Sequence, residues 1–98
     1  FQLVQEHIVE MQIKLNNTRN FLYRTCWKMD NGIPVNNDAA MLKRYGAPAL
    51  TDCCSRALQL MGGIGFTDET RVSRLMLDCR GFQIGGGTVE IMVHISGR

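Results

Sequence analysis

The sequence predicts an all-α protein, an antiparallel bundle of four helices in a single domain spanning residues 1–98. Three observations predict this class. Apolar residues recur every three or four positions over long stretches, which is the period of a helix with one buried face. Glycines, in one place together with a proline, separate these stretches at short intervals. The chain of 98 residues is long enough for one hydrophobic core, but too short for separate cofactor and substrate domains.

The first predicted helix is long and amphipathic, and it should end near Asn31. Its apolar stripe steps by three and four residues through Phe1, Val4, Ile8, Met11, Leu15, Thr18, Leu22, Thr25 and Met29. Gly32 and Pro34 follow directly and supply residues that stop a helix. The connection to the next helix is short, so the two helices should pack antiparallel.

The second predicted helix begins at a polar N-cap, Asn37 or Asp38, and runs to Met61. Gly62–Gly63 then stops it. Pro48 lies inside this helix, where a proline removes one hydrogen bond and bends the chain. We therefore expect a kink at Pro48.

Two shorter helices should complete the bundle, each after a glycine-rich turn. Thr67 can cap the third helix, and Thr88, after the Gly85–Gly87 turn, can cap the fourth. The apolar residues of these two helices are Val72, Leu75, Met76 and Cys79, then Ile91, Met92 and Ile95. The last group could also form a strand, but a lone strand would have no partner in a helical chain.

The composition excludes several function classes. The net charge of +2 is spread in mixed sign without a basic block, which argues against nucleic acid as a partner. No apolar run approaches the roughly 20 residues of a membrane span. Four cysteines and two histidines occur at no spacing typical of metal ligands: Cys26, Cys53, Cys54, Cys79, His7 and His94. Free thiols and a reducing compartment are expected.

The N-terminal residues already lie within the periodic pattern of the first helix, without an initiator methionine or a signal peptide. We therefore expect the sequence to begin inside a longer polypeptide.

The two glycine turns are the positions that could bind a ligand. Each leads into a helix, whose free N–H groups and positive dipole end suit an anion such as phosphate. The Gly85–Gly87 turn is the better candidate, since glycines allow close backbone approach and Thr88 adds a hydroxyl. A tight connection that binds nothing explains the same glycines. The first turn is no dinucleotide-fold fingerprint, because a helix and not a strand precedes it.

Three segments make the sequence similar to one family. Gln59–Phe66 (QLMGGIGF) resembles the acyl-CoA dehydrogenase signature in which a Gln is followed by Gly-Gly-x-Gly-aromatic. Arg74–Cys79 (RLMLDC) resembles the family segment that ends in Arg-Asp-Ala, and Ile84–Ile91 (IGGGTVEI) resembles its Gly-Thr-x-Glu-Ile element. Phe1–Gln2 resembles its Phe-Gln pair. The resemblance covers the whole chain, from Phe1 to Arg98.

The resemblance implies the C-terminal helical domain of a flavoenzyme that holds FAD and converts acyl-CoA thioesters to 2-enoyl-CoA. It also implies a homo-oligomer, a tetramer or a dimer, that passes electrons to an electron-transferring flavoprotein in the bacterial cytoplasm or the mitochondrial matrix. Acyl-CoA oxidases and flavin hydroxylases share this fold. A non-catalytic helical association module remains the alternative from another class.

The resemblance also assigns residues. Those implied to contact FAD are Gln2, Gln59, Leu60, Met61, Gly62, Gly63, Thr88, Val89 and Glu90. Gly87 corresponds to a glycine beside the substrate. Gly86 occupies the position at which medium- and short-chain members carry the catalytic Glu, and Leu77 stands where the family usually has Arg. Isovaleryl- and long-chain-type members place the Glu on the preceding helix, so we expect the base upstream of Phe1 and no catalytic residue or metal ligand within 1–98. A flavoprotein that has lost dehydrogenase activity is the other interpretation of Gly86.

Overall fold

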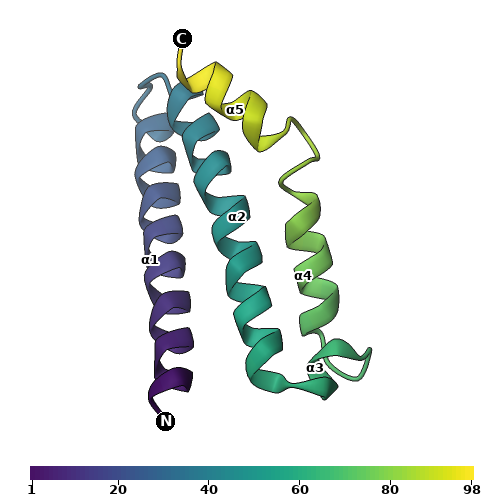
Figure 1. Cartoon of the computed structure of the whole chain (residues 1–98). Coiled ribbons are helices and arrows are strands. Elements are labelled where there is room, and N and C mark those ends of the chain that lie inside the picture. Colours follow the sequence, from purple (N-terminus) through teal and green to yellow (C-terminus); the bar gives the residue numbers. More distant parts are fainter.

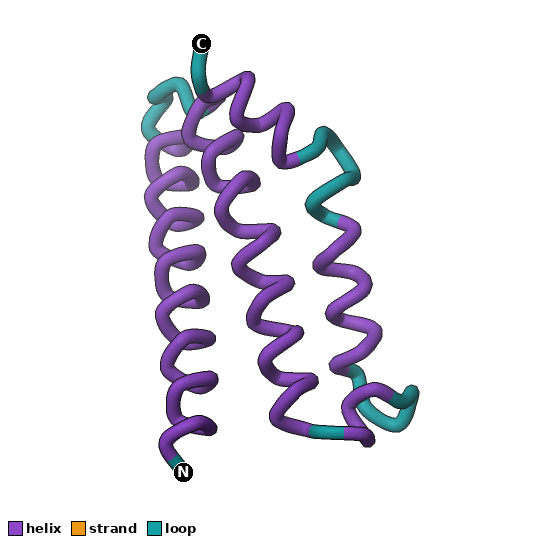
Figure 2. The backbone as a smooth tube through the Cα atoms, in the orientation of Figure 1, coloured by secondary structure: helices purple, strands orange, loops and turns teal.

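The computed structural model describes all residues, Phe1–Arg98, and contains five helices and no strand (Figures 1 and 2). The helices are α1 (Gln2–Asp30), α2 (Asn36–Met61), α3 (Gly63–Phe66), α4 (Val72–Gly81) and α5 (Val89–Ser96). The all-α prediction is confirmed. The helix that the sequence did not predict is α3, a four-residue turn of helix within the first glycine-rich segment.

The α1–α2 hairpin is antiparallel, as the short connection predicts (Figure 1). α1 ends at Asp30, where the Asn31 side chain donates a hydrogen bond of 2.8 Å to the Trp27 carbonyl. Lys28 Nζ and Asp38 Oδ1 lie 3.1 Å apart and join the two helices beside the turn. The predicted end of the first helix near Asn31 is therefore confirmed.

The start of α2 differs from the prediction. Val35 is the N-cap, and no side chain caps the helix, so the expected caps Asn37 and Asp38 lie inside the first turn. The Asp38 carboxylate instead accepts hydrogen bonds from Lys28 of α1. α2 continues unbroken through Pro48, and the bend expected there remains a prediction.

Thr67 is also not the cap that the sequence predicts. It follows α3, and its hydroxyl donates to the Ile64 carbonyl at 2.7 Å. α4 begins five residues later at Val72, with Arg71 at the N-cap and no side-chain cap. A capping side chain reaches only the second or third N–H beyond it, so Thr67 is too far from α4.

α2 lies in the middle of the molecule, with α1 and α4 along its two sides and α5 across its N-terminal half (Figure 1). This arrangement is a thin layer of helices, and its core is small. The buried residues of the core are Thr25, Ala40, Ala47, Ala49, Val89 and Met92. An open apolar groove of about 390 Å³ runs between α1, α2 and α4. None of the helices combines the length and the apolar character needed to cross a membrane.

Candidate cofactor and substrate site

The structure separates the predicted site residues into two clusters. The Gln59 cluster contains Gln2, Gln59, Leu60, Met61, Gly62 and Gly63, and the Gly87 cluster contains Gly87, Thr88, Val89 and Glu90. Gln2 belongs to the first cluster because α1 and α2 are antiparallel: His7 faces Arg56, so the start of α1 lies level with the end of α2 (Figure 1).

The two clusters lie far apart along α2. Lys43 of α2 contacts the Gly87 cluster, whereas Gln59 is 16 positions further along the same helix. At 1.5 Å per residue, these positions are separated by about 24 Å along the helix axis. One copy of the chain therefore does not bring all predicted contacts around one point.

The Gln59 cluster is an exposed helix end. Gly62 ends α2 with φ +71°, a conformation that favours glycine. The side-chain amides of Gln2 and Gln59 are exposed and make no hydrogen bond within the chain. A Cβ added at Gly63 would meet nothing within 4 Å. These polar groups and the open backbone beside them are available to a ligand.

Gly65, the last glycine of this turn, has a packing role. It is buried, and a Cβ added there would lie 2.9 Å from the Met61 Cβ and 3.1 Å from the Leu58 carbonyl oxygen. Glycine is thus required for α3 to fold back against the end of α2.

The Gly87 cluster is built on a tight turn and a capped helix. Thr88 is the N-cap of α5, and its Oγ1 accepts a hydrogen bond of 3.2 Å from the Ile91 N–H, which confirms the predicted cap. Gly86 and Gly87 have φ values of +69° and +103°. A Cβ at Gly87 would lie 2.5 Å from the Met92 Cε, so the turn needs glycine for both conformation and space.

Most N–H groups of this turn are free within the chain. The Val89 N–H bonds to the Gln83 carbonyl at 3.1 Å, and the Ile91 N–H bonds to Thr88. The N–H groups without an acceptor in the chain are those of Gly86, Gly87, Thr88 and Glu90. They can donate to an anion or a carbonyl oxygen. Val89 is the least accessible predicted contact, since its side chain is buried and its N–H is bonded.

Lys43 joins α2 to this turn, and the sequence analysis gave it no role. Its Nζ donates to the carbonyl oxygens of Gly85 and Gly87, the latter at 2.6 Å. The bonded positions lie 42 and 44 residues beyond Lys43, so no local spacing pattern could reveal the contact.

A second open groove, of about 810 Å³, lies beside the turn at the end of α4. Its wall includes the apolar side chains of Leu75, Leu77 and Phe82 together with Gly85 and Gly86. Apolar side chains and free N–H groups thus meet at one place. This combination suits a ligand that has an apolar part and an anionic or carbonyl part.

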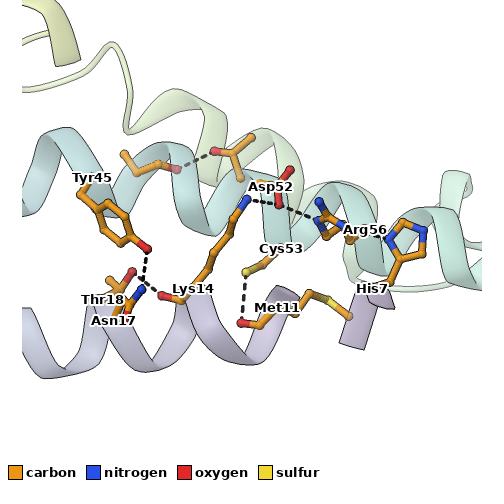
Figure 3. Close-up of polar contacts among 11 residues, drawn as sticks. His7, Met11, Lys14, Asn17, Thr18, Tyr45, Asp52, Cys53 and Arg56 are labelled. Carbon is orange, nitrogen blue, oxygen red and sulfur yellow. Dashed lines mark hydrogen bonds and ion pairs between the residues drawn. The ribbon is translucent and has the colours of Figure 1, made fainter. Parts of the chain in front are cut away.

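A chain of polar contacts holds α1 against α2 between the two clusters (Figure 3). Asp52 lies 2.5 Å from Lys14 Nζ and 2.8 Å from Arg56 Nε, and an Arg56 terminal nitrogen lies 3.2 Å from His7 Nδ1. The hydrogen bonds from Lys14 and Arg56 lower the pKa of Asp52, although partial burial opposes this effect. The network is a structural joint between the helices. His7 takes part in it and is paired with no nucleophile.

The four cysteines lie on α1, α2 and α4. All four are free, and Cys54 Sγ and Cys79 Sγ lie 3.8 Å apart between α2 and α4. Burial, with the hydrogen bond to Cys79, raises the pKa of the Cys54 thiol to about 11. Burial also raises the pKa of Cys53. No three His, Cys, Asp or Glu side chains gather as a ligand set for a metal ion.

The fold is that of an all-α domain in which two exposed glycine turns carry the predicted site residues. A family model described as the acyl-CoA dehydrogenase C-terminal domain matches residues 1–98. The chain belongs to this family, which is a family of oxidoreductases, as its C-terminal helical domain.

Three relatives illustrate the similarity. The probable acyl-CoA dehydrogenase YdiO of Escherichia coli strain K12 is 42% identical over 97 residues, which are 99% of this chain and 25% of YdiO. The crystal structure of an acyl-CoA dehydrogenase from Slackia heliotrinireducens has a TM-score of 0.95 at 41% identity, with 98% of this chain and 26% of that chain covered. The FAD complex of PigA has a TM-score of 0.94 at 33% identity over 100% of this chain and 26% of that one. The chain thus spans about a quarter of its relatives' length.

Proposed function

We propose that this chain is the FAD-binding and oligomerisation domain of an acyl-CoA dehydrogenase that converts acyl-CoA thioesters to 2-enoyl-CoA. The observation that carries the proposal is the Gly87 cluster, where a turn that requires glycine presents free N–H groups beside an apolar groove. Membership in the acyl-CoA dehydrogenase family suggests the ligand of this turn, namely FAD with an acyl-CoA substrate beside it.

The residues present fit FAD. Free N–H groups at the start of α5 suit phosphate or carbonyl oxygens, and the Thr88 hydroxyl lies at the same helix end. At the other cluster, the free amides of Gln2 and Gln59 can donate to and accept from ribose and phosphate groups. When bound, FAD would take up the hydride that leaves the β carbon of the acyl group.

The two clusters are assigned to an arrangement between subunits. In the family that the chain resembles, part of the FAD contacts goes to the cofactor of the neighbouring subunit. On that basis we assign the Gly87 cluster to the flavin of its own subunit and the Gln59 cluster to the flavin of a neighbouring subunit, and the separation of about 24 Å along α2 is compatible with this assignment. In this arrangement the chain contributes to two sites, and cofactor binding depends on oligomer formation.

The catalytic base is proposed to lie in the remainder of the polypeptide. The turn itself carries no carboxylate, since Gly86 stands where other members have Glu. Gly86 also has φ +69°, which is unfavourable for a residue with a side chain. The chain would therefore bind and orient, while a Glu outside residues 1–98 would remove the α proton.

The partners proposed are an acyl-CoA substrate, further copies of the same subunit and an electron-transferring flavoprotein. The relative from Escherichia coli supports a bacterial origin, and the compartment proposed is the cytoplasm.

The experiment measures flavin bound per subunit in the full-length protein. We expect Gln59→Ala and Thr88→Ala each to lower flavin retention about tenfold, because each removes hydrogen bonds to the cofactor worth on the order of 1 kcal/mol or more. Thr88→Ala also removes the cap of α5, which orients the same N–H groups. Gln12→Ala, which changes an exposed amide on α1, and Thr88→Ser, which keeps the hydroxyl, are the matched controls. Unchanged retention in both alanine variants would refute the assigned contacts.

A helical association module is the second candidate. The small core and the open apolar groove between α1, α2 and α4 favour it. This candidate predicts a full-length protein that contains no flavin, whereas the flavoenzyme proposal requires the cofactor to be present in stoichiometric amount.

A further inference from the structure

We propose that Lys43 is a positioning residue for the Gly87 cluster: its ammonium group holds the carbonyl oxygens of Gly85 and Gly87, and thereby directs the N–H groups of the turn toward the bound ligand. The functional part of this inference rests on the proposed function. The structural part, that Lys43 orients the turn, depends only on the two hydrogen bonds that the structure shows.

The geometry places Lys43 against the turn itself. Its Nζ bonds to both carbonyl oxygens, and a Cβ added at the intervening Gly86 would lie 3.3 Å from the same nitrogen. One ammonium group therefore bonds to two residues of the turn and leaves little room for a side chain at the residue between them. Lys43 belongs to α2, and the turn directly precedes α5. The contact therefore fixes the start of α5 relative to the central helix.

Lys43 also differs from the other lysines of the chain. Lys14 and Lys28 each pair with an aspartate, whereas Lys43 forms no ion pair and bonds only to main-chain carbonyls. Hydrogen bonds with a charged donor are stronger than neutral ones. The positive charge of Lys43 consequently acts on the backbone of the turn alone.

Peptide geometry connects these carbonyls to the free N–H groups. In a trans peptide the C=O and N–H point in opposite directions, and the chain has no cis peptide. When Lys43 binds the Gly85 carbonyl, the N–H of Gly86 in the same peptide unit points away from the lysine. The Gly87 carbonyl orients the N–H of Thr88 in the same way. These N–H groups have no acceptor within the chain.

The contact also limits a flexible segment. Three consecutive glycines have wide conformational freedom, and two of them adopt positive φ here. Without Lys43 the turn could adopt other conformations, in which its N–H groups face elsewhere. We therefore expect the loss of Lys43 to affect ligand orientation more than the stability of the domain.

The first test measures hydrogen exchange in the full-length protein. In Lys43→Met, the N–H groups of Val89 and Ile91, which are bonded within the chain, should exchange about tenfold faster or more. Lys14→Met is the matched control, since it removes the pair with Asp52 and touches no residue of the turn. Unchanged exchange in Lys43→Met would overturn the proposed orientation of the turn.

The second test follows the flavin of the same variants. Lys43→Met should shift the visible flavin spectrum and lower the rate of anaerobic bleaching by saturating acyl-CoA about 10- to 100-fold, as expected for a misplaced reacting group. Lys43→Arg, which keeps a charged donor, should restore part of the rate. If Lys43→Met and Lys14→Met changed the flavin spectrum and the bleaching rate equally and only slightly, Lys43 would be a structural contact only. That result would overturn its functional role.

The two tests separate failure of this inference from failure of the proposed function. A wild-type protein without flavin, or with flavin that no acyl-CoA bleaches, would refute the proposed function and with it the functional role of Lys43. Faster exchange of Val89 and Ile91 in Lys43→Met would still support the orientation of the turn in that case.

Discussion

At the scale of single residues, one carboxylate joins the two long helices. Asp52 of α2 accepts hydrogen bonds from Lys14 of α1 and from Arg56 of its own helix (Figure 3). The hydrogen bond from Lys14 is the largest cause of the lowered pKa of Asp52, and the Arg56 bond acts in the same direction. The charged form of Asp52 is therefore the form that the folded protein stabilises.

This pKa shift makes a prediction about pH. Because the folded pKa lies below the ordinary value of 3.8, the stabilisation is present above that value and is lost as pH falls through the folded pKa. Asp52→Asn should lower the thermal unfolding midpoint of the full-length protein at pH 7 and by less at pH 3. The effect should be small, about 1 kcal/mol or less, since the carboxylate is partly exposed.

Asp68→Asn provides the control for this measurement, because Asp68 is exposed, lies between α3 and α4 and forms no ion pair. It should leave the midpoint nearly unchanged at both pH values. A constant difference between wild type and Asp52→Asn from pH 7 to pH 3 would contradict the assigned role of the ionised carboxylate.

At the scale of elements, α3 is held against α2 by a glycine that tolerates no side chain. Gly65→Ala would place a Cβ 2.9 Å from the Met61 Cβ and should destabilise the protein by about 1–3 kcal/mol, as overpacking does. Gly81→Ala is the control, because a Cβ there would meet nothing within 4 Å. The thermal unfolding midpoints of the two variants compare them directly, and equal midpoints would count against the close contact.

The four longer helices were predictable from the sequence, but α3 was not, and the starts of α2 and α4 were predicted at the wrong residues. Hydrophobic period and glycine stops give the extent of α1 and α2 because these signals are local. The Thr88 cap was also predictable, since it directly precedes its helix. The predicted caps are wrong because the helices begin elsewhere: α2 begins before Asn37 and Asp38, and α4 begins five residues after Thr67. Asp38 and Thr67 bond instead to Lys28 and to the Ile64 carbonyl. Such contacts depend on the packed structure.

The candidate site was predictable only in part. The motifs that resemble the family predict the residues of both clusters. They do not predict that the clusters lie apart along α2. The Lys43 contact was also missed, since it joins residues more than 40 positions apart. Glycine requirements such as the one at Gly87 depend on Met92, a side chain that only the folded turn brings near.

At the scale of the whole molecule, the chain is a thin layer of helices with few buried residues (Figure 1), and its two candidate clusters lie apart along α2. Its length is about a quarter of that of its relatives. The proposed enzyme therefore needs both the rest of the polypeptide and neighbouring subunits. In this account the domain supplies cofactor contacts to two sites and leaves the proton transfer to a carboxylate elsewhere.

The most direct test of this account uses the full-length protein and a panel of acyl-CoA thioesters without oxygen, with the visible absorption of the flavin as the readout. The account predicts that one class of acyl-CoA bleaches the flavin band, as hydride passes to FAD, and that the product is a 2-enoyl-CoA. A protein that binds flavin but is bleached by no acyl-CoA, or one that contains no flavin, would contradict it.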